Sequence, residues 1–593
     1  MFCTLLHHEF GCSFSGKNLL KTKPENLKKM SNNRRNFLKS VGTLSLGAAI
    51  ISPLSAIANT NQTEEMKLDA AIDRSKPQTI SILQTTDVHC QIHPHDELFW
   101  ENGKAVFRKT GGYAYMATLL KQLKKKNPNT YTIDTGDMFQ GSELSVETTG
   151  EAFVPILNAL NYDLYLPGNW EVIYGKRKMQ TLLGSLDAPK ICTNMYHDLG
   201  NGKRGEHIFQ PYTIWNIAGA KIGFLGYTDP LVPLRQSPNY SKGIIYTNPE
   251  ENLAHYVDVL RNQEQCSYVI IIAHLGLSQQ IALANRLECE GVNYILGGDT
   301  HERVRKPIVC KYSKVVEPGA FGSFIGKLDL TILNGKVVSD SYELIEVDSP
   351  KIKPDAKIEK LLKEKESVYQ EQINNVIGYS TIPLYRYFVV ENPIDTMILN
   401  ALNWKFPDID INLSNGFRFC PPKTTADQTG NIPITNGFIF DMLPVDSTVR
   451  TAKVTGKQLK NWLEKELNNV FADDASKRFG GWVVKFKGME VRFNAFAEMD
   501  KRVQSITVKN MPLDPEKLYS IMACERDGDP VDMLCRMKGV MDAKNTNATL
   551  HSVMRDYLKQ NSPVTPTPQK NAIILDAPET LLTQVTGVDY TFT

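Results

Sequence analysis

The N-terminal half of the chain repeats one pattern: a short apolar run, rich in β-branched residues, ends in a polar residue that can bind a metal ion. Such runs are typical of buried strands in α/β folds when they alternate with longer amphipathic segments. The expected strands are residues 79–84, 130–133, 163–166, 221–226, 268–273 and 293–296. The expected helices are residues 113–126, 251–263 and 278–290. This half is therefore predicted to be an α/β layered domain.

Five polar motifs stand at the ends of these strands. They are Thr86-Asp87-Val88-His89, Gly136-Asp137, Gly168-Asn169, Ala273-His274 and Gly298-Asp299-Thr300-His301. Taken singly, His274 could be a core histidine and Asp87 could cap a helix. Because ligands collect at the carboxyl ends of strands in α/β folds, we expect the five motifs to converge on a metal cluster.

Asp137 is the natural bridge between two cations about 3.5–4 Å apart. Two close cations lower the pKa of a bridging water, so hydroxide becomes available near neutral pH. The series of motifs therefore predicts a hydrolase with two divalent metal ions.

The first 58 residues have the order of an export signal. Arg34-Arg35 is followed by a weakly apolar run that ends in Ala56-Ile57-Ala58, and this order resembles the twin-arginine type. A periplasmic or otherwise exported protein is predicted, with an uncleaved signal anchor or a basic turn before a buried helix as alternatives. Met30 directly precedes the signal, so a start codon set too early would account for residues 1–29.

Composition narrows the class of protein. A length of 593 residues favours two domains and a connector, and a net charge of +2 gives no general attraction to nucleic-acid polymers or membranes. Eight cysteines lie beyond the signal without a Cys-x-x-Cys spacing, which argues against a disulfide scaffold or a structural zinc site. Cys90 is expected to be buried and inert, with a reactive thiol as the alternative.

The C-terminal half differs in composition. A Lys/Glu-rich stretch over 348–377 predicts a solvent-facing linker helix, and residues 378–582 mix expected helices at 393–404 and 455–469 with short strands. The predicted parts are the export signal (1–58), the α/β domain (78–347), the linker (348–377) and an α+β substrate domain (378–582).

The strand-end motifs together resemble the metallophosphoesterase domain of the 5′-nucleotidase family. Three motifs of the C-terminal half resemble the second domain of that family: Glu391-Asn392-Pro393-Ile394-Asp395, Leu413-Ser414-Asn415-Gly416-Phe417-Arg418 and Val454-Thr455-Gly456-Lys457-Gln458-Leu459. The resemblance implies a four-layer metallophosphoesterase-type β-sandwich flanked by helices, followed by a 5′-nucleotidase-type α+β domain.

The resemblance also implies roles for single residues. One ion would be held by Asp87, His89, Asp137 and His301, and the other by Asp137, Asn169, His274 and Asp299. Asp137, Asn169 and Arg418 would be catalytic, with Arg418 holding the substrate anion. Asn415, Phe417 and Trp170 would contact the substrate. This donor set suits Mn²⁺ and leaves Zn²⁺ or Fe²⁺ open.

The sequence departs from the nucleotidase pattern in three places. Trp170 and Ile173 replace the histidine and aspartate of a dyad that helps the leaving group depart, and such general acid help is usually worth about 10²–10⁴-fold. Residues 443–446 and 524–529 lack the aromatic pair that clamps a base, although Phe417, Phe419 or Phe440 could substitute. Asp299 stands where the family usually has histidine.

The first departure resembles the thiosulfohydrolase (SoxB-like) branch of the family, which has Trp-Glu in place of His-Glu. Three functions therefore stay open. The first is hydrolysis of a phosphoester, a nucleotide or a related small molecule, by hydroxide held between the ions. The second is hydrolysis of a sulfonated cysteine on a sulfur-carrier protein. The third is a non-catalytic metal- or ligand-binding protein. His93 or His95 is a candidate proton donor in place of the dyad.

Overall fold

The computed structural model describes residues 74–414, 420–425 and 430–582, which belong to one compact unit of the chain. The predicted export signal lies outside the described residues, as do Asn415, Phe417 and Arg418. Within the described residues, no helix has the length and apolar character that crossing a membrane requires.

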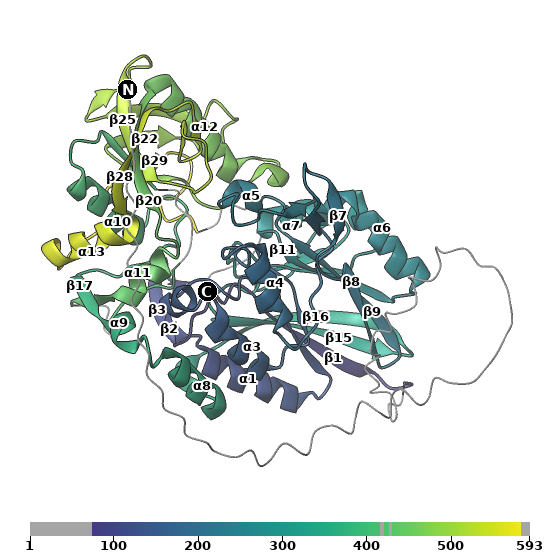
Figure 1. The fold of residues 1–593 in the computed structure, drawn as a ribbon. Helices are drawn as coiled ribbons and strands as arrows, with labels where there is room; N and C mark the ends of the chain where they lie inside the picture. Colours follow the sequence, from purple (N-terminus) through teal and green to yellow (C-terminus); the bar gives the residue numbers. More distant parts are fainter. Residues whose placement is uncertain (1–73, 415–419, 426–429, 583–593) are drawn as a thin grey trace, which may run out of the picture. The chain divides into compact units, whose positions relative to one another are not determined.

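The first sheet of the N-terminal half has five strands in the order β16-β15-β1-β4-β5. Its strands are β1 (Gln78–Thr85), β4 (Thr130–Asp134), β5 (Leu164–Tyr165), β15 (Phe324–Leu333) and β16 (Lys336–Glu346). β1, β4 and β5 are parallel, whereas β15 runs antiparallel to both β1 and β16. The helices α1 (Tyr113–Lys126), α3 (Val154–Leu160) and α8 (Ala356–Glu366) lie along this sheet (Figure 1).

The second sheet has six strands in the order β13-β14-β12-β11-β9-β8. Its strands are β8 (Tyr212–Ile217), β9 (Ala220–Thr228), β11 (Tyr268–His274), β12 (Tyr294–Leu296), β13 (Ile308–Val309) and β14 (Lys314–Val316). β9, β11, β12 and β14 are parallel. The helices α6 (Leu253–Asp258) and α7 (Leu277–Ala284) follow β10 and β11 in the chain.

Both sheets contribute to one hydrophobic core. Ile80 and Ile82 of β1 are fully buried in it, as are Ile270 and Ile272 of β11. A strand covered on both faces needs a continuous apolar run, which explains why Tyr268–His274 lacks polar alternation. The predicted α/β fold of this half is confirmed.

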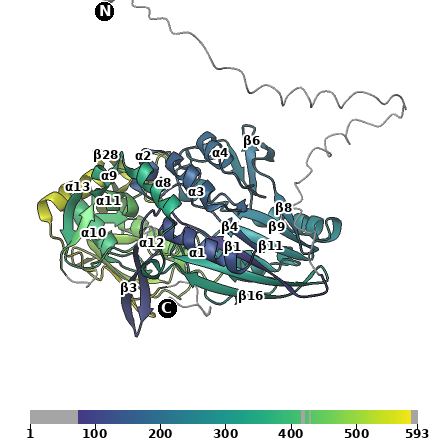
Figure 2. The ribbon, with the colours of Figure 1, turned by 90° about the horizontal axis from the view of Figure 1, so that it is seen from below.

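The smaller elements of this half connect the main layers. They are β2 (His95–Glu101), β3 (Lys104–Thr110), β6 (Met195–Asp198), β7 (Arg204–His207), β10 (Ile244–Tyr246), α2 (Glu143–Glu147), α4 (Lys176–Gly184) and α5 (Val232–Arg235). The β2–β3 hairpin projects as a separate two-stranded ribbon (Figure 2).

A buried carboxylate fixes this hairpin. Glu97 is 1% exposed and accepts hydrogen bonds from Arg303 Nη2 at 2.6 Å, from Ser323 Oγ at 2.7 Å and from the hydroxyl of Tyr387. Next to it, Leu98 packs against Tyr387. The hairpin is thus joined to the rest of the chain by both charge and apolar contact.

The Lys/Glu-rich stretch forms α8 and the short α9 (Gln370–Asn374). Asp355 caps α8 by accepting from the backbone of Lys357 and Ile358. Ile358 and Leu362 are buried in the N-terminal core, while Lys357 and Lys363 are exposed. One face of this helix therefore packs on the α/β domain, and its lysines face solvent.

The C-terminal half is an α+β domain built on a five-stranded sheet in the order β21-β18-β25-β20-β28. The strands of this sheet are β18 (Ile411–Ser414), β20 (Thr448–Thr455), β21 (Lys485–Lys487), β25 (Leu518–Cys524) and β28 (Met541–Thr549). A second sheet comprises β22 (Met489–Phe493), β23 (Val503–Val508), β24 (Met511–Pro512) and β29 (Ala572–Ile574). Two small sheets comprise β17 (Val376–Ser380) with β19 (Ile432–Thr435), and β26 (Met533–Leu534) with β27 (Met537–Lys538).

Its helices are α10 (Pro393–Lys405), α11 (Asn436–Met442), α12 (Gly456–Phe471) and α13 (Leu550–Asn561). The motif at 454–459 is the start of α12. Thr455 accepts from the backbone of Gln458, whose side chain accepts from the backbone of Thr455, so the two form a capping box.

Candidate metal centre

The parallel strands deliver the predicted ligands to one place. β1 ends two residues before Asp87, β4 ends three residues before Asp137, and His274 is the last residue of β11. β1 and β4 are neighbours in the first sheet, and β11 lies in the second. The ligands therefore meet where the carboxyl ends of the two sheets approach each other.

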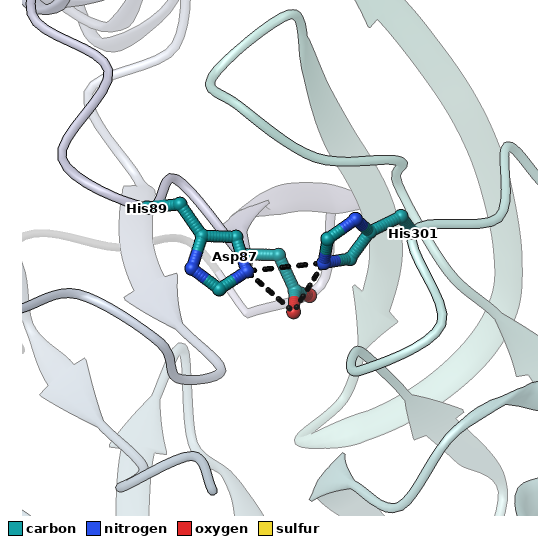
Figure 3. A group of neighbouring side chains, drawn as sticks. All are labelled: Asp87, His89 and His301. Atoms are coloured by element: carbon teal, nitrogen blue, oxygen red, sulfur yellow. Dashed lines mark hydrogen bonds and ion pairs between the residues drawn. The ribbon is translucent and has the colours of Figure 1, made fainter. Parts of the chain in front are cut away.

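Asp87, His89 and His301 form one compact group (Figure 3). The Nε2 atoms of the two histidines are 3.0 Å apart, and His301 Nε2 is 3.3 Å from Asp87 Oδ1. Two imidazole lone pairs at this distance repel each other unless a proton or a cation lies between them. The group has the donor types and the spacing that a metal ion requires.

Asp87, Asp137 and His274 form a second group. His274 Nε2 is 3.2 Å from Asp137 Oδ2 and 3.9 Å from Asp87 Oδ1. Asp137 Oδ2 is also 3.6 Å from Nε2 of His89, so this oxygen lies between a histidine of each group. Asp87 belongs to both groups, which the sequence did not indicate.

Asn169 and Asp299 border the second group. Asn169 Nδ2 donates to Asp299 Oδ1 at 2.6 Å, and that oxygen is 3.8 Å from His274 Nε2. The backbone N–H of Asp299 donates to Asp87 Oδ2 at 3.0 Å. The structure thus brings all seven predicted ligands together, while the predicted contacts of Arg418, Asn415 and Phe417 lie outside the described residues.

The surroundings of these side chains fit a metal ion. His89 Nδ1 and His274 Nδ1 lie 2.9 and 2.7 Å from the carbonyl oxygens of Gln140 and Thr135, so each Nδ1–H donates to backbone and each Nε2 faces the cluster. Asp87 Oδ1 and His274 Nε2 are buried without a hydrogen-bond partner among the described residues. Buried polar atoms of this kind are costly unless a ligand satisfies them.

The ligand turns have an unusual backbone. Asp87, His89, Asp137, Asp299 and His301 have φ values of 50°, 49°, 63°, 94° and 62°. These lie in the left-handed region, which non-glycine residues rarely occupy. Strained backbone of this kind clusters at functional sites, where the surrounding fold holds it in place.

A cavity of about 570 Å³ opens onto this cluster. Asp137, Asn169, Asp299 and His301 line it together with Trp170, whose backbone N–H donates to Asp137 Oδ1 at 2.8 Å. Its other aromatic lining residues are Tyr240, Phe479 and Trp482. The volume is that of a site for a small organic molecule.

Comparison with known proteins identifies the two halves. Residues 80–303 match the calcineurin-like phosphoesterase family, and residues 376–524 match the 5′-nucleotidase C-terminal domain. The chain belongs to the 5′-nucleotidase family of metallophosphoesterases. Members of this family are hydrolases that act on phosphoester bonds, and the chain is a hydrolase of this type.

Its relatives span most of its length. A 5′-nucleotidase of Vibrio cholerae is 24% identical over 589 residues, covering 89% of this chain and 97% of the relative. A 5′-nucleotidase of Diplobatis ommata is 23% identical over 553 residues, covering 86% of this chain and 92% of the relative.

Solved structures share the fold. The sulfate thiohydrolase SoxB of Thermus thermophilus superposes with a TM-score of 0.75 at 20% identity, covering 85% of this chain and 98% of that one. A 5′-nucleotidase precursor from Thermus thermophilus gives a TM-score of 0.71 at 21% identity, covering 84% of this chain and all of that one.

The charges of this metallophosphoesterase centre are strongly coupled. Burial lowers the pKa of His89 to about 4. Burial also opposes the charged form of His274, but Asp137 and Asp87 outweigh it and raise the pKa of His274 well above its ordinary value. A divalent ion would satisfy the same carboxylates, so metal binding is expected to release a proton from the cluster.

Glu171 is a residue of the centre whose role sequence reasoning missed. Its carboxylate accepts from the backbone N–H groups of Asp137 at 3.1 Å, Met138 at 2.7 Å and Gly168. It therefore ties the turn that carries Asp137 to the turn that carries Asn169. Burial, with Asp137 nearby, raises the pKa of Glu171 to about 7.

Other candidates have no place in the metallophosphoesterase cavity. His93 pairs with Glu366 and His95 Nε2 contacts Ser323 Oγ, and neither histidine lines the cavity. Cys90 is fully buried, donates to the carbonyl of Met138, and has a pKa raised by burial. Phe440 packs on His551 and is likewise absent from the lining.

Asp134 gives a pH-dependent term in the stability of the metallophosphoesterase domain. It is fully buried, and burial raises its pKa to about 8. An acid with a folded pKa above its unfolded value of about 3.9 stabilises the fold fully below pH 4, and that contribution is lost as pH rises toward 8. Asp134→Asn mimics the protonated acid. As pH rises from 4.5 to 8.5, the Tm of this variant should therefore rise relative to the Tm of the wild type. Parallel Tm curves for the two proteins would contradict the assignment.

Proposed function

We propose that the chain is an exported hydrolase that uses two divalent metal ions to cleave the phosphoester of a small molecule, a nucleotide or a related compound. The observation that carries this proposal is the pair of Asp/His groups that share Asp87 and reach the 570 Å³ cavity through Asp137 and His301. The 5′-nucleotidases among its relatives support a nucleotide substrate. Arg34-Arg35 and the small-residue site after it support export.

The residues of the cluster fit the chemistry. Asp87, His89, Asp137 and His301 would hold one ion, and Asp137, Asn169, His274 and Asp299 the other. Bound divalent ions supply Lewis acidity and a nucleophile at neutral pH. The mixed oxygen and nitrogen donors support Mn²⁺ as the metal, with Zn²⁺ and Fe²⁺ as alternatives.

The chain's own residues position the substrate and exclude water. Asp137, Asn169 and His301 face the cavity, so a bound ester would lie directly against the ligands. Trp170, Phe479 and Trp482 line the same cavity and offer ring surfaces for an organic group. Arg418 is proposed to hold the substrate anion, and Asn415 and Phe417 are proposed to contact the substrate.

The leaving group is the second constraint on the substrate. Trp170 and Ile173 cannot protonate a departing oxygen, and neither His93 nor His95 lines the cavity. General acid help usually contributes about 10²–10⁴-fold. We therefore expect the best substrates to be esters whose leaving group departs without protonation.

The same observation favours a second candidate, hydrolysis of a sulfonated cysteine on a sulfur-carrier protein. A thiolate is a better leaving group than an alkoxide and needs no acid. The fold shared with SoxB is compatible with this reaction. In that case a protein partner would reach the cavity.

A substrate panel separates these proposals. The chain beginning at Asn59 should be loaded with Mn²⁺ and assayed with AMP, with a chromogenic phosphodiester and with a thiosulfonate. We expect turnover of at least one phosphoester and none after chelation. Turnover of the thiosulfonate alone would replace the first proposal by the second. Confirmed binding of two ions without turnover of any of the three substrates would overturn both proposals.

A further inference from the structure

A partly buried arginine contacts the proposed ligand cluster from α5, the short helix that follows β9. Arg235 is the last residue of α5, and its side chain is 16% exposed. Its Nη1 lies 2.9 Å from Asp299 Oδ2 and 3.3 Å from Asp229 Oδ2. Asp229 is 1% exposed, so the guanidinium neutralises two carboxylates that have little access to water.

The next residue contacts the other ligand on this side. Gln236 Nε2 donates to Asn169 Oδ1 at 3.2 Å, and Asn169 Nδ2 donates to Asp299 Oδ1 at 2.6 Å. Two successive side chains, Arg235 and Gln236, thus contact both Asp299 and Asn169. These two ligands are proposed for the second ion and not for the first.

The contact with Arg235 decides which oxygen of Asp299 faces the cluster. Oδ2 is engaged by the guanidinium, while Oδ1 faces Asn169 and lies 3.8 Å from His274 Nε2. Without the arginine, the buried carboxylate of Asp229 would lose the cation beside it, and its charge would repel that of Asp299. The carboxylate of Asp299 would then turn away from Asp229 and from its place beside His274.

The position of the guanidinium is itself restrained. Its Cζ lies 5.2 Å from the ring centroid of Phe479, which lines the same cavity. The carbonyls of Leu234 and Gln236 accept hydrogen bonds from Arg526, so the backbone on both sides of Arg235 is also held. A side chain fixed in this way can orient a metal ligand.

We infer that Arg235 is a positioning residue for the second metal ion: it holds Asp299 with Oδ1 toward the cluster and balances the charge that Asp299 and Asp229 add. The inference rests on the proposed two-ion function. It predicts that Arg235 governs the binding of one ion and leaves the other unchanged. Outer contacts of this kind are typically worth 10–100-fold in metal affinity.

The test is a Mn²⁺ titration of the metal-free chain beginning at Asn59, followed by calorimetry, with electron paramagnetic resonance reporting whether two Mn²⁺ ions couple. Arg235→Gln should weaken one of the two binding events about 10–100-fold and remove the coupled signal. Arg235→Lys keeps the charge but loses the planar guanidinium with its paired donors. This variant should restore part of the Mn²⁺ affinity. Arg204→Gln is the matched control, because Arg204 is exposed and pairs with Glu251 on the same half of the chain.

A double-variant cycle separates positioning from a general structural role. Asp299→Asn should weaken the same binding event, and Arg235→Gln with Asp299→Asn should cost little more than Asp299→Asn alone, because the two changes remove one interaction. Two undisturbed binding events in Arg235→Gln would overturn the inference, as would equal weakening of both events or additive losses in the double variant. If Arg235→Gln fails to fold, Arg235→Lys and Asp299→Asn decide by the same criteria.

The titration contains no substrate, so its outcome is independent of the reaction. Two coupled ions in the wild type, with no ester hydrolysed, would end the proposed function and leave the role of Arg235 standing. Full turnover in Arg235→Gln with both ions bound would overturn the role of Arg235 and leave the proposed function standing.

Discussion

Replacing Asp137 with asparagine should lower phosphoester turnover by more than about 100-fold and reduce the bound metal. Loss of a residue that only contacts a metal ligand typically lowers metal affinity or activity about 10–100-fold. Asp137 is itself a proposed ligand, and its Oδ2 lies within 3.6 Å of a histidine from each group. An amide keeps the shape but loses the negative charge that holds a cation. Turnover with the best ester of the panel and metal content per chain are the measurements.

Asp134→Asn is the matched control for this change. It makes the same chemical substitution three residues earlier, at a buried acid whose raised pKa keeps it protonated near neutral pH. Metal content should stay at the wild-type level in this variant. Equal loss of metal in both variants would show that the effect of Asp137 is general damage to the turn.

Glu97→Gln should lower the free energy of unfolding by about 3–5 kcal/mol, the usual cost of breaking a buried ion pair. Arg303, 1% exposed, would keep its charge in the interior after losing the carboxylate that lies 2.6 Å away. The contacts from Ser323 and Tyr387 would weaken at the same time. Denaturant unfolding followed by fluorescence measures the change.

Glu101→Gln is the control for this second prediction, because Glu101 lies in the same strand and pairs with Arg108 at the surface, where both side chains are about 40% exposed. Exposed pairs contribute about 0–1 kcal/mol. The replacement of both Glu97 and Arg303, by Gln and Met, should be less harmful than Glu97→Gln alone, since no buried charge remains. If Glu97→Gln lowered the free energy of unfolding no more than Glu101→Gln does, the role given to the buried pair would be contradicted.

The sequence indicated the parallel strands β1, β4, β5, β9, β11 and β12 because their signal is local, and it did not indicate the short parallel strand β14. Tyr268–His274 is an unbroken apolar run, and a strand covered on both faces needs such a run. The helix expected at 113–126 has those bounds. By contrast, β15 (Phe324–Leu333) was not predicted from the sequence, although its alternating burial is typical of a strand with one covered face.

In the candidate site, too, some residues could be predicted from the sequence and others could not. The seven predicted ligands lie in five motifs that follow apolar runs, so their convergence could be predicted from strand ends alone. Arg235 and Glu171 could not be, because their contacts join segments far apart in the chain: Arg235 reaches Asp299, 64 residues away, and Glu171 reaches Asp137, 34 residues away. No periodicity indicates such pairs, and only the folded turns create them.

The left-handed backbone at five of the seven proposed ligands has a consequence for the stability of the fold. Each such residue costs the fold of order 1 kcal/mol relative to a relaxed turn, and glycine at the same position removes most of that cost. Replacing one of these residues with glycine is therefore expected to stabilise the fold while it removes a proposed ligand. Asp87, His89, Asp137, Asp299 and His301 thus place their side chains at the cluster at a cost to the stability of these turns.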